Sequence, residues 1–578
     1  MHAIDGALAE LGVRRFLLAI HDVSFPTDPD EDAGRGTPYS RASERFLDFA
    51  RGLGFTGLQL GPQGQTSIDN ASPYDGTFFS RNVDSLPLRA FAGLVDDADL
   101  AAAIVPPSPR ADHARAHRAL HHLVARARET GDVDGFLARH REWLEKDALY
   151  DALRAGYGDK GFRDWPAHGD AGFWLRDPSA LLAQHAAHVR RYAFAQLLAH
   201  EAHSRFRDAC ARRGLVLYAD LQVGTSDADA WARASCFLRD YVMGAPPSRT
   251  NPEGQPWGYG VLDPRAEGAA FFDARIEKTF AEYDGLRVDH PHGLVCPWVY
   301  RHGTADPEAA VRAGARLHES PDLPDHPALA PFAIARADQL DRAVPRYADE
   351  WVTGLDQSQI DRYAARFDRL VAAAVRNGRD PKGLACEVLS TAPHPLRCVL
   401  ERHRLGRFRI TQKANLDDPS DGYRTENAAP PDWAMIGNHD TPPVFALVRD
   451  WPIERREKWR AYLGPRLRLS AADETRLALE PRFLAQALLA DLFLCPAENV
   501  SIFFGDLFGY EESFNVPGLV HPDNWTLRLP ADFESLYARR LSTQSALDIP
   551  FALALALDAR GSTSGLAAHL RQNRSSLE

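Results

Sequence analysis

The sequence predicts an α/β fold: a (β/α)8 TIM barrel with helical insertions between its strands. Three observations lead to this expectation. Short apolar runs recur eight times, each is followed by a loop of Gly, Pro, Asp or His, and helical patterns separate most of them. Eight strands that alternate with helices are typical of a closed parallel barrel. A doubly wound open sheet would produce a similar sequence, so the pattern alone leaves that architecture open.

The eight apolar runs are short and have few polar residues, as expected for parallel strands that are buried on both faces. In chain order they span residues 16–20, 57–60, 215–219, 285–288, 384–386, 408–411, 434–436 and 500–504.

Two connections are too long for simple helical crossovers. We expect residues 1–578 to form a single catalytic barrel that carries a helical insertion subdomain at 94–170, after the second strand. A second insertion is expected at 301–382, between the fourth and fifth strands, with Asp- and Pro-rich loops before an amphipathic helix near 360–376. Insertions of this size on a barrel usually lie over the catalytic face and shape substrate access.

Composition excludes several classes of protein. The net charge of −12, without a basic cluster interleaved with aromatic residues, argues against a nucleic-acid partner. No apolar stretch reaches the about 18 residues that a membrane span needs, and the N-terminus lacks the pattern of a secretory signal. The composition does not indicate an oligomeric state. Reduced thiols in a cytoplasmic protein are expected, because the six cysteines are scattered without a CxxC pair, at positions 210, 236, 296, 386, 398 and 495.

Histidines are concentrated in the first insertion, at His113, His117, His121 and His122. A metal site is conceivable there, but a solvated or stacked helical face is the favoured interpretation. We find no P-loop, GxGxxG or HExxH motif. We expect no metal and no organic cofactor, because the two carboxylates described below complete the chemistry.

Three acids follow three different strand candidates. Asp289 ends the fourth, Glu387 ends the fifth, and Asp440 follows the seventh. Because the carboxyl ends of all barrel strands meet on one face, acids far apart in the sequence can share a pocket there.

The first two acids have different surroundings. Arg287 projects from the same strand face as Asp289, since side chains alternate with period two, and it favours an ionised Asp289. A purely structural Arg–Asp pair is the alternative interpretation. Glu387 has apolar neighbours, which raise a carboxyl pKa as a general acid requires. Two carboxyls tuned apart in this way are typical of a glycosidase nucleophile and acid, about 5–5.5 Å apart in retaining enzymes.

The chain resembles the 4-alpha-glucanotransferases (amylomaltases, or disproportionating enzymes) of glycoside hydrolase family 77. The resemblance covers roughly residues 14–530 in discontinuous blocks and starts from Arg-x-Asp-His, a strand-end Glu and Asn-His-Asp. Other similar segments are Leu-Gln-Leu-Gly-Pro at 58–62, Ser-Pro-Tyr-Asp at 72–75, the third strand ending in Asp220-Leu221, Asp-Ala-Asp-Ala-Trp at 227–231, the loop at 244–260, and Asn-Val-Pro-Gly at 515–518 with Asn-Trp at 524–525.

The resemblance implies a role for each matching residue. Asp289 would be the nucleophile, Glu387 the acid/base and Asp440 the transition-state stabiliser. Arg287 would orient Asp289, and His439 would contact the sugar. Residues expected to line the substrate groove are Tyr74, Asp220, Trp257, His290 and Asn438.

The implied activity is transfer of an α-1,4-glucan segment from a maltooligosaccharide or α-glucan donor to a sugar acceptor. The chain departs from the family pattern at Val388, where an Asp usually follows the acid/base, at His290-Pro291-His292, and at Gln59. Two alternatives therefore stay open: an α-glucan hydrolase, and a glucan-binding protein whose activity has decayed.

Overall fold

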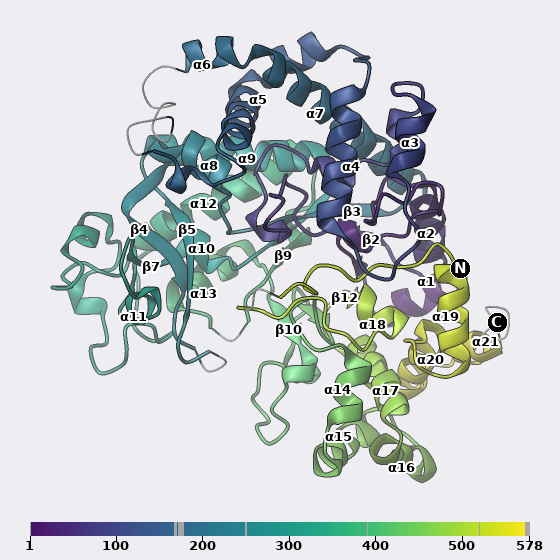
Figure 1. The fold of residues 1–578 in the computed structure, drawn as a ribbon. Helices are drawn as coiled ribbons and strands as arrows, with labels where there is room; N and C mark the ends of the chain where they lie inside the picture. The colour runs from purple at the N-terminus through teal and green to yellow at the C-terminus, as the bar shows by residue number, and fades with distance from the viewer. Residues whose placement is uncertain are drawn as a thin grey trace.

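The computed structural model describes residues 2–166, 170, 178–248, 251–389, 391–518 and 521–572. Within them, a sheet of eight parallel strands forms the centre of the molecule (Figure 1). Its strands are β1 (Arg15–Ala19), β2 (Gly57–Gln59), β3 (Val216–Leu221), β6 (Gly285–Val288), β9 (Leu384–Cys386), β10 (Phe408–Ile410), β11 (Trp433–Met435) and β12 (Asn499–Phe503).

The strand order shows that the sheet nearly closes on itself. It runs β10-β11-β12-β1-β2-β3-β6-β9, which is the chain order of a barrel cut between β9 and β10. A parallel bridge between Cys386 and Arg407 joins these two edges. The prediction of a (β/α)8 barrel is thus confirmed, and the open doubly wound sheet is excluded. The first and last residues of each predicted strand differ by at most two positions from those of an observed strand.

The barrel interior is filled by side chains, which explains why its strands are apolar on both faces. Leu17, Tyr218, Phe408 and Trp433 belong to the cluster inside the barrel, while neighbours such as Phe16 and Leu18 pack outward against helices. Gly285 leaves room for Tyr218, because a Cβ there would lie 2.4 Å from the Tyr218 ring.

Helices cover the outside of the barrel, and two of them show clear sequence reasons for where they begin. Ser40 caps α2 (Arg41–Gly52) by accepting from the Ser43 amide, and Asp356 with Gln359 forms a capping box on α12 (Gln357–Arg376). Those outside the long insertions are α1 (His2–Glu10), α2 (Arg41–Gly52), α8 (Asp227–Ala232), α9 (Ala266–Glu282), α10 (His292–Val295), α13 (His394–His403), α14 (Val444–Asp450), α15 (Ile453–Arg466), α16 (Ala471–Leu479), α17 (Pro481–Leu494), α18 (Phe504–Phe508), α19 (Phe533–Ser542), α20 (Ile549–Arg560) and α21 (Leu566–Gln572).

The connection from β2 to β3 forms a helical layer at the top of Figure 1. It comprises α3 (Asp97–Ala103), α4 (His113–Arg126), α5 (Val133–Gly156), α6 (Ser179–Gln184) and α7 (Ala186–Arg212). Residues 167–169 of the expected 94–170 insertion lie outside the described residues.

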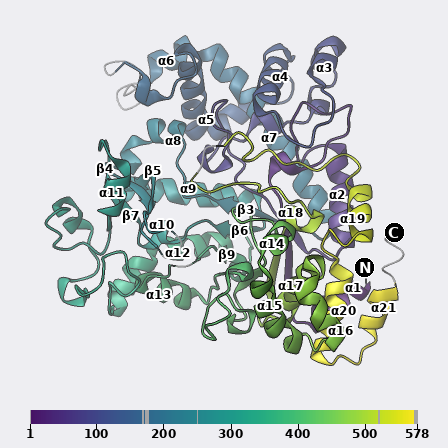
Figure 2. The ribbon, with the colours of Figure 1, turned by 60° about the horizontal axis from the view of Figure 1, so that its bottom comes forward.

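A second, antiparallel sheet lies beside the barrel and was not predicted (Figure 2). Its order is β5-β4-β7-β8, with β4 (Phe237–Ala245), β5 (Gln255–Leu262), β7 (Trp298–Arg301) and β8 (Ala315–Arg316). The loop expected at 244–260 is therefore wrong in part, because residues 244–245 belong to β4 and residues 255–260 belong to β5. Gly and Pro residues interrupt the alternation of these strands, and the β4–β5 pairing has register shifts, so the local pattern is weak.

The 301–382 stretch also contains α11 (Pro307–Arg312) and α12 (Gln357–Arg376). No helix among the described residues combines the length and apolarity needed to cross a bilayer.

Candidate active site

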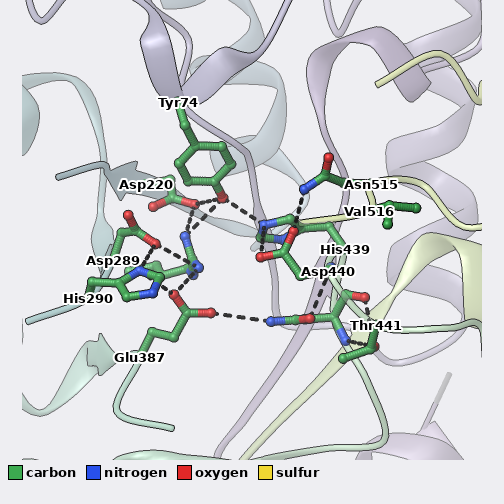
Figure 3. A network of polar contacts seen from close by, with 12 residues as sticks. Tyr74, Asp220, Asp289, His290, Glu387, His439, Asp440, Thr441, Asn515 and Val516 are labelled. Atoms are coloured by element: carbon green, nitrogen blue, oxygen red, sulfur yellow. Dashed lines mark hydrogen bonds and ion pairs between the residues drawn. The ribbon is translucent and has the colours of Figure 1, made fainter. Parts of the chain in front are cut away.

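The three predicted acids lie together at the carboxyl ends of the barrel strands. Asp289 directly follows β6, Glu387 directly follows β9, and Asp440 lies in the loop after β11. Figure 3 shows them in one polar network. Figure 3 also shows His439, Tyr74, Asp220 and His290 in that network. Arg287 and Asn438 belong to it through their contacts with Asp289 and Glu387, and Trp257 joins it through a ring contact with His290.

Arg287 lies at the centre of this network. Its Nη2 lies 2.5 Å from Glu387 Oε2 and 3.1 Å from Asp289 Oδ1. Its Nη1 donates to Tyr74 Oη at 3.0 Å and pairs with Asp220. Burying an unpaired carboxylate is costly. The buried guanidinium of Arg287 offsets this cost for Asp220, Asp289 and Glu387, which it contacts.

Asp289 is held in its ionised form. Burial alone would raise its pKa, but the charges of His290 and Arg287 outweigh burial and hold the pKa far below the usual aspartate range. His290 Nδ1 lies 3.0 Å from Asp289 Oδ1, and the Val223 amide donates to Oδ2 at 3.3 Å. An ionised, oriented carboxylate is what a nucleophile requires.

Glu387 is tuned in the opposite direction. Burial raises the pKa of its carboxyl, and the negative charge of Asp289 adds to this rise against the lowering effect of Arg287. Asn438 Nδ2 donates to Glu387 Oε1 at 3.2 Å. An oxygen of Glu387 and an oxygen of Asp289 lie within 4.8 Å of each other. Two close carboxyls with pKa values pushed apart can divide proton donation and nucleophilic attack between them.

Asp440 is positioned by two neighbours. Asn515 Nδ2 donates to its Oδ1 at 2.6 Å, and His439 Nε2 lies 3.4 Å from its Oδ2. Burial alone would raise the pKa of Asp440, but His439 and the Asn515 hydrogen bond keep it below its ordinary value. Tyr74 Oη links the two halves of the site, because it donates to Asp220 at 2.9 Å and contacts His439 Nε2 at 3.1 Å.

His290 adopts a backbone conformation that is uncommon for a residue with a side chain, with φ of 41°. Its ring meets the Trp257 ring edge-on, with centroids 5.1 Å apart. Burial alone would lower the pKa of His290, but Asp289 and Glu387 raise it to about 9. The strained turn therefore places a positive charge against both catalytic candidates.

Sequence analysis did not identify two residues of this site, Asn515 and His21, as functional candidates. Asn515 comes from a distant segment, and only its place in an Asn-Val-Pro-Gly motif could have indicated it. His21 follows β1, so the strand-end argument used for the acids would have found it. Its buried ring lies 5.0 Å from the His439 ring, and neither ring nitrogen has a hydrogen-bond partner among the described residues.

The site is a poor fit for a metal ion. Asp289, His290 and Glu387 present ligand atoms within 4.8 Å of one another. However, Arg287 Nη2 already lies within 3.1 Å of both carboxylates, so a divalent cation there would face a buried guanidinium. We derive no step through a metal.

Sequence comparisons point to one family. A family model described as 4-alpha-glucanotransferase, glycoside hydrolase family 77, matches residues 23–533. A 4-alpha-glucanotransferase of Aquifex aeolicus is 27% identical over 512 residues, an alignment that covers 85% of this chain and 91% of that protein. The 4-alpha-glucanotransferase of Thermus thermophilus is 26% identical over 314 residues, which cover 49% of this chain and 60% of that protein.

Solved structures show the same fold. The amylomaltase from Streptococcus agalactiae in complex with acarbose superposes with a TM-score of 0.69 at 15% identity, over 95% of this chain and 99% of that one. The amylomaltase from Corynebacterium glutamicum gives a TM-score of 0.65 at 17% identity, over 94% and 76% of the two chains.

Proposed function

Because the chain belongs to the 4-alpha-glucanotransferase family, glycoside hydrolase family 77, we propose that it transfers α-1,4-glucan segments between maltooligosaccharides by a retaining double displacement. The donor is a maltooligosaccharide or α-glucan, and the acceptor is a sugar with a free 4-hydroxyl. One observation carries this proposal: Asp289 and Glu387 have oxygens within 4.8 Å of each other and pKa values shifted in opposite directions. Such closeness suits a retaining enzyme, because an inverting one needs about 6.5–9.5 Å between its carboxyls for water.

In the first step, an Asp289 carboxylate oxygen attacks the anomeric carbon of the donor as the glycosidic C–O bond breaks. Glu387 gives its proton to the departing oxygen, which leaves as the 4-hydroxyl of the released sugar. In the second step, the Glu387 carboxylate takes the proton of the acceptor 4-hydroxyl. The acceptor oxygen bonds to the anomeric carbon, the bond to Asp289 breaks, and Glu387 is protonated again.

The remaining residues bind the sugar and stabilise charge. Asp440, held by His439 and Asn515, would hydrogen-bond sugar hydroxyls more strongly as the ring flattens toward an oxocarbenium ion. Tyr74 and Trp257 offer aromatic faces to the apolar C–H faces of sugars. Arg287 keeps the acids oriented and balances their charge.

Transfer rather than hydrolysis requires that water be excluded while the glycosyl-enzyme waits for an acceptor. We propose that the 244–260 segment and the 301–382 insertion serve this purpose. We also propose that residues 1–578 work as one catalytic unit, with the 94–170 helical insertion as a subdomain. We also propose a cytoplasmic location, supported by the fact that all six cysteines are free thiols.

The test is incubation with maltotriose alone, with products separated by length. A transferase converts maltotriose into glucose and a ladder of longer maltooligosaccharides, whereas a hydrolase yields glucose and maltose without longer products. A decayed binding protein would leave maltotriose intact while still binding acarbose, the ligand in the Streptococcus agalactiae amylomaltase structure. Absence of products longer than maltotriose at any enzyme concentration would overturn the proposal.

Asn515 gives a second test of the site. Asn515→Ala removes the 2.6 Å hydrogen bond to Asp440, and a bond to a charged group contributes about 1.5–3 kcal/mol. We expect kcat/KM on maltotriose to fall roughly 10- to 100-fold, with the melting temperature little changed. Asn427→Ala is the matched control, since Asn427 donates to the carbonyls of Pro419 and Asp421, outside the network around Arg287. Equal activity of the two variants would contradict the assigned role of Asn515.

A further inference from the structure

Two histidines of α4 meet an aspartate outside the catalytic network. His117 and His121 are four residues apart and so lie on one face of the helix. Asp84 comes from the 3-10 turn η3 (Val83–Ser85). His117 Nδ1 lies 3.2 Å from Asp84 Oδ2, and His121 Nε2 lies 3.4 Å from Asp84 Oδ1. The histidine rings stack as expected from the sequence, with centroids 3.9 Å apart, but Asp84 was not anticipated as their partner.

The spacing of these atoms suits a tetrahedral ion. Zinc bonds to His nitrogen and carboxylate oxygen are about 2.0–2.2 Å long, which puts two ligand atoms of a tetrahedron roughly 3.3–3.5 Å apart. The two N–O distances of 3.2 and 3.4 Å are close to this value, and one ligand atom from each residue lies within 4.8 Å of the others. Two imidazoles with one carboxylate form a donor set that zinc accepts.

Two of these atoms also lack hydrogen bonds. Asp84 Oδ1 and His121 Nε2 are both buried and have no hydrogen-bond partner among the described residues. The Asp84 side chain is 8% exposed, and the His121 side chain is 37% exposed. Buried polar atoms are nearly always satisfied, so two buried atoms that share only a 3.4 Å ion-pair contact indicate that a ligand can complete the site. The partly exposed His121 leaves a path for an ion to enter.

The charge around the cluster favours a cation. Asp84 brings a carboxylate to the cluster, and its two oxygens lie 3.2 Å from His117 Nδ1 and 3.4 Å from His121 Nε2. Asp151 and Asp159 add negative charge that acts on His121. The position of Asp84 does not depend on the histidines, because the Asp84 amide donates to Asn82 Oδ1 at 3.0 Å.

We propose that Asp84, His117 and His121 bind a zinc ion that joins η3 to α4, with water completing a tetrahedral site. The role is structural. Helix α4 also carries His113, whose Nε2 lies 2.8 Å from the Trp525 carbonyl oxygen, and the Trp525 ring lies 5.8 Å from the ring of His439. The ion would therefore fix a helix that supports one wall of the active site, without contacting substrate.

The experiment uses the full-length chain, stripped of metal and titrated with Zn²⁺ alone. We expect one zinc per chain and a melting temperature that rises with zinc concentration, since a ligand that binds only the folded state stabilises it. His117→Gln and Asp84→Asn should each weaken zinc binding by about 100-fold or more, because even partners that only orient metal ligands contribute 10- to 100-fold. Co²⁺ in place of Zn²⁺ should give the visible absorption of tetrahedral coordination.

His122→Gln is the matched control, because His122 lies on the same helix with a 59% exposed side chain that faces Asp99 instead. It should bind zinc like the parent chain. If Asp84→Asn does not fold, His121→Gln still tests the site, since His121 is the most exposed of the three ligands. Circular dichroism without metal checks the fold of each variant. The proposal is overturned if the parent chain binds no zinc, or if zinc binding survives both His117→Gln and His121→Gln.

Discussion

Asp289→Asn is expected to lower the rate of maltotriose disproportionation by at least about 10³-fold, the scale on which an enzyme depends on its nucleophile. The amide keeps the shape of the side chain but cannot supply the carboxylate oxygen that attacks the anomeric carbon. Arg287 and His290 would then lose one of the negative charges that they balance. Product formation from maltotriose and acarbose affinity, measured on the same preparation, separate lost chemistry from lost binding.

The control for this variant is Asp380→Asn at the opposite end of the barrel. Asp380 also pairs with an arginine, Arg15, but it precedes β9 rather than following a strand. Residues at that end of a barrel contribute to stability rather than to catalysis. We expect full turnover from the control. If Asp289→Asn binds acarbose and still turns over at a tenth of the parent rate or more, Asp289 is not the nucleophile.

Glu387→Gln is expected to lower the rate on maltotriose by about 10²–10⁴-fold, because both proton transfers are lost. An α-maltosyl fluoride donor needs no protonation of its leaving group, so the first step should recover with this donor. The second step still lacks its base, and the glycosyl-enzyme should accumulate. Mass spectrometry of peptides from the reacted variant should then find a maltosyl ester on Asp289.

The pH profile provides a further readout for Glu387. Its pKa is raised, so the protonated acid that the first step needs is present below that pKa and is lost as pH rises through it. The parent enzyme should lose activity on this alkaline side. In Glu387→Gln with the fluoride donor, the alkaline loss due to this group should disappear. An unchanged rate on maltotriose, or no ester with the fluoride, would contradict the acid/base assignment.

The barrel strands could be predicted because parallel strands are buried on both faces. Runs such as Phe16–Leu18 carry large apolar residues at consecutive positions, which local sequence shows directly. The β4–β5 hairpin could not be predicted in the same way. Its strands are partly exposed, contain Gly and Pro, and pair with register shifts, so their stability depends on β7 and on packing between distant segments.

The candidate acids could be located because they directly follow strands, and the barrel gathers strand ends on one face. Asn515 could not be found this way, since it lies in a loop after β12 and reaches Asp440 across 75 residues of sequence. The partners of His117 and His121 were equally hidden. Asp84 belongs to a short turn with no pattern that would connect it to α4.

By itself, the sequence determined the eight apolar strands and the positions of Asp289, Glu387 and Asp440 after three of them, since apolar patterning and strand-end position are local properties. Closure of the strands into a barrel was decided by the tertiary structure. Only the tertiary structure decided how these acids are tuned. One guanidinium, that of Arg287, contacts Asp220, Asp289 and Glu387. Burial raises the pKa of each acid, and the charges beside it decide whether that pKa ends above or below its ordinary value. Electrostatic energies depend on distance and on exclusion of water, and both arise only when segments far apart in the chain pack together.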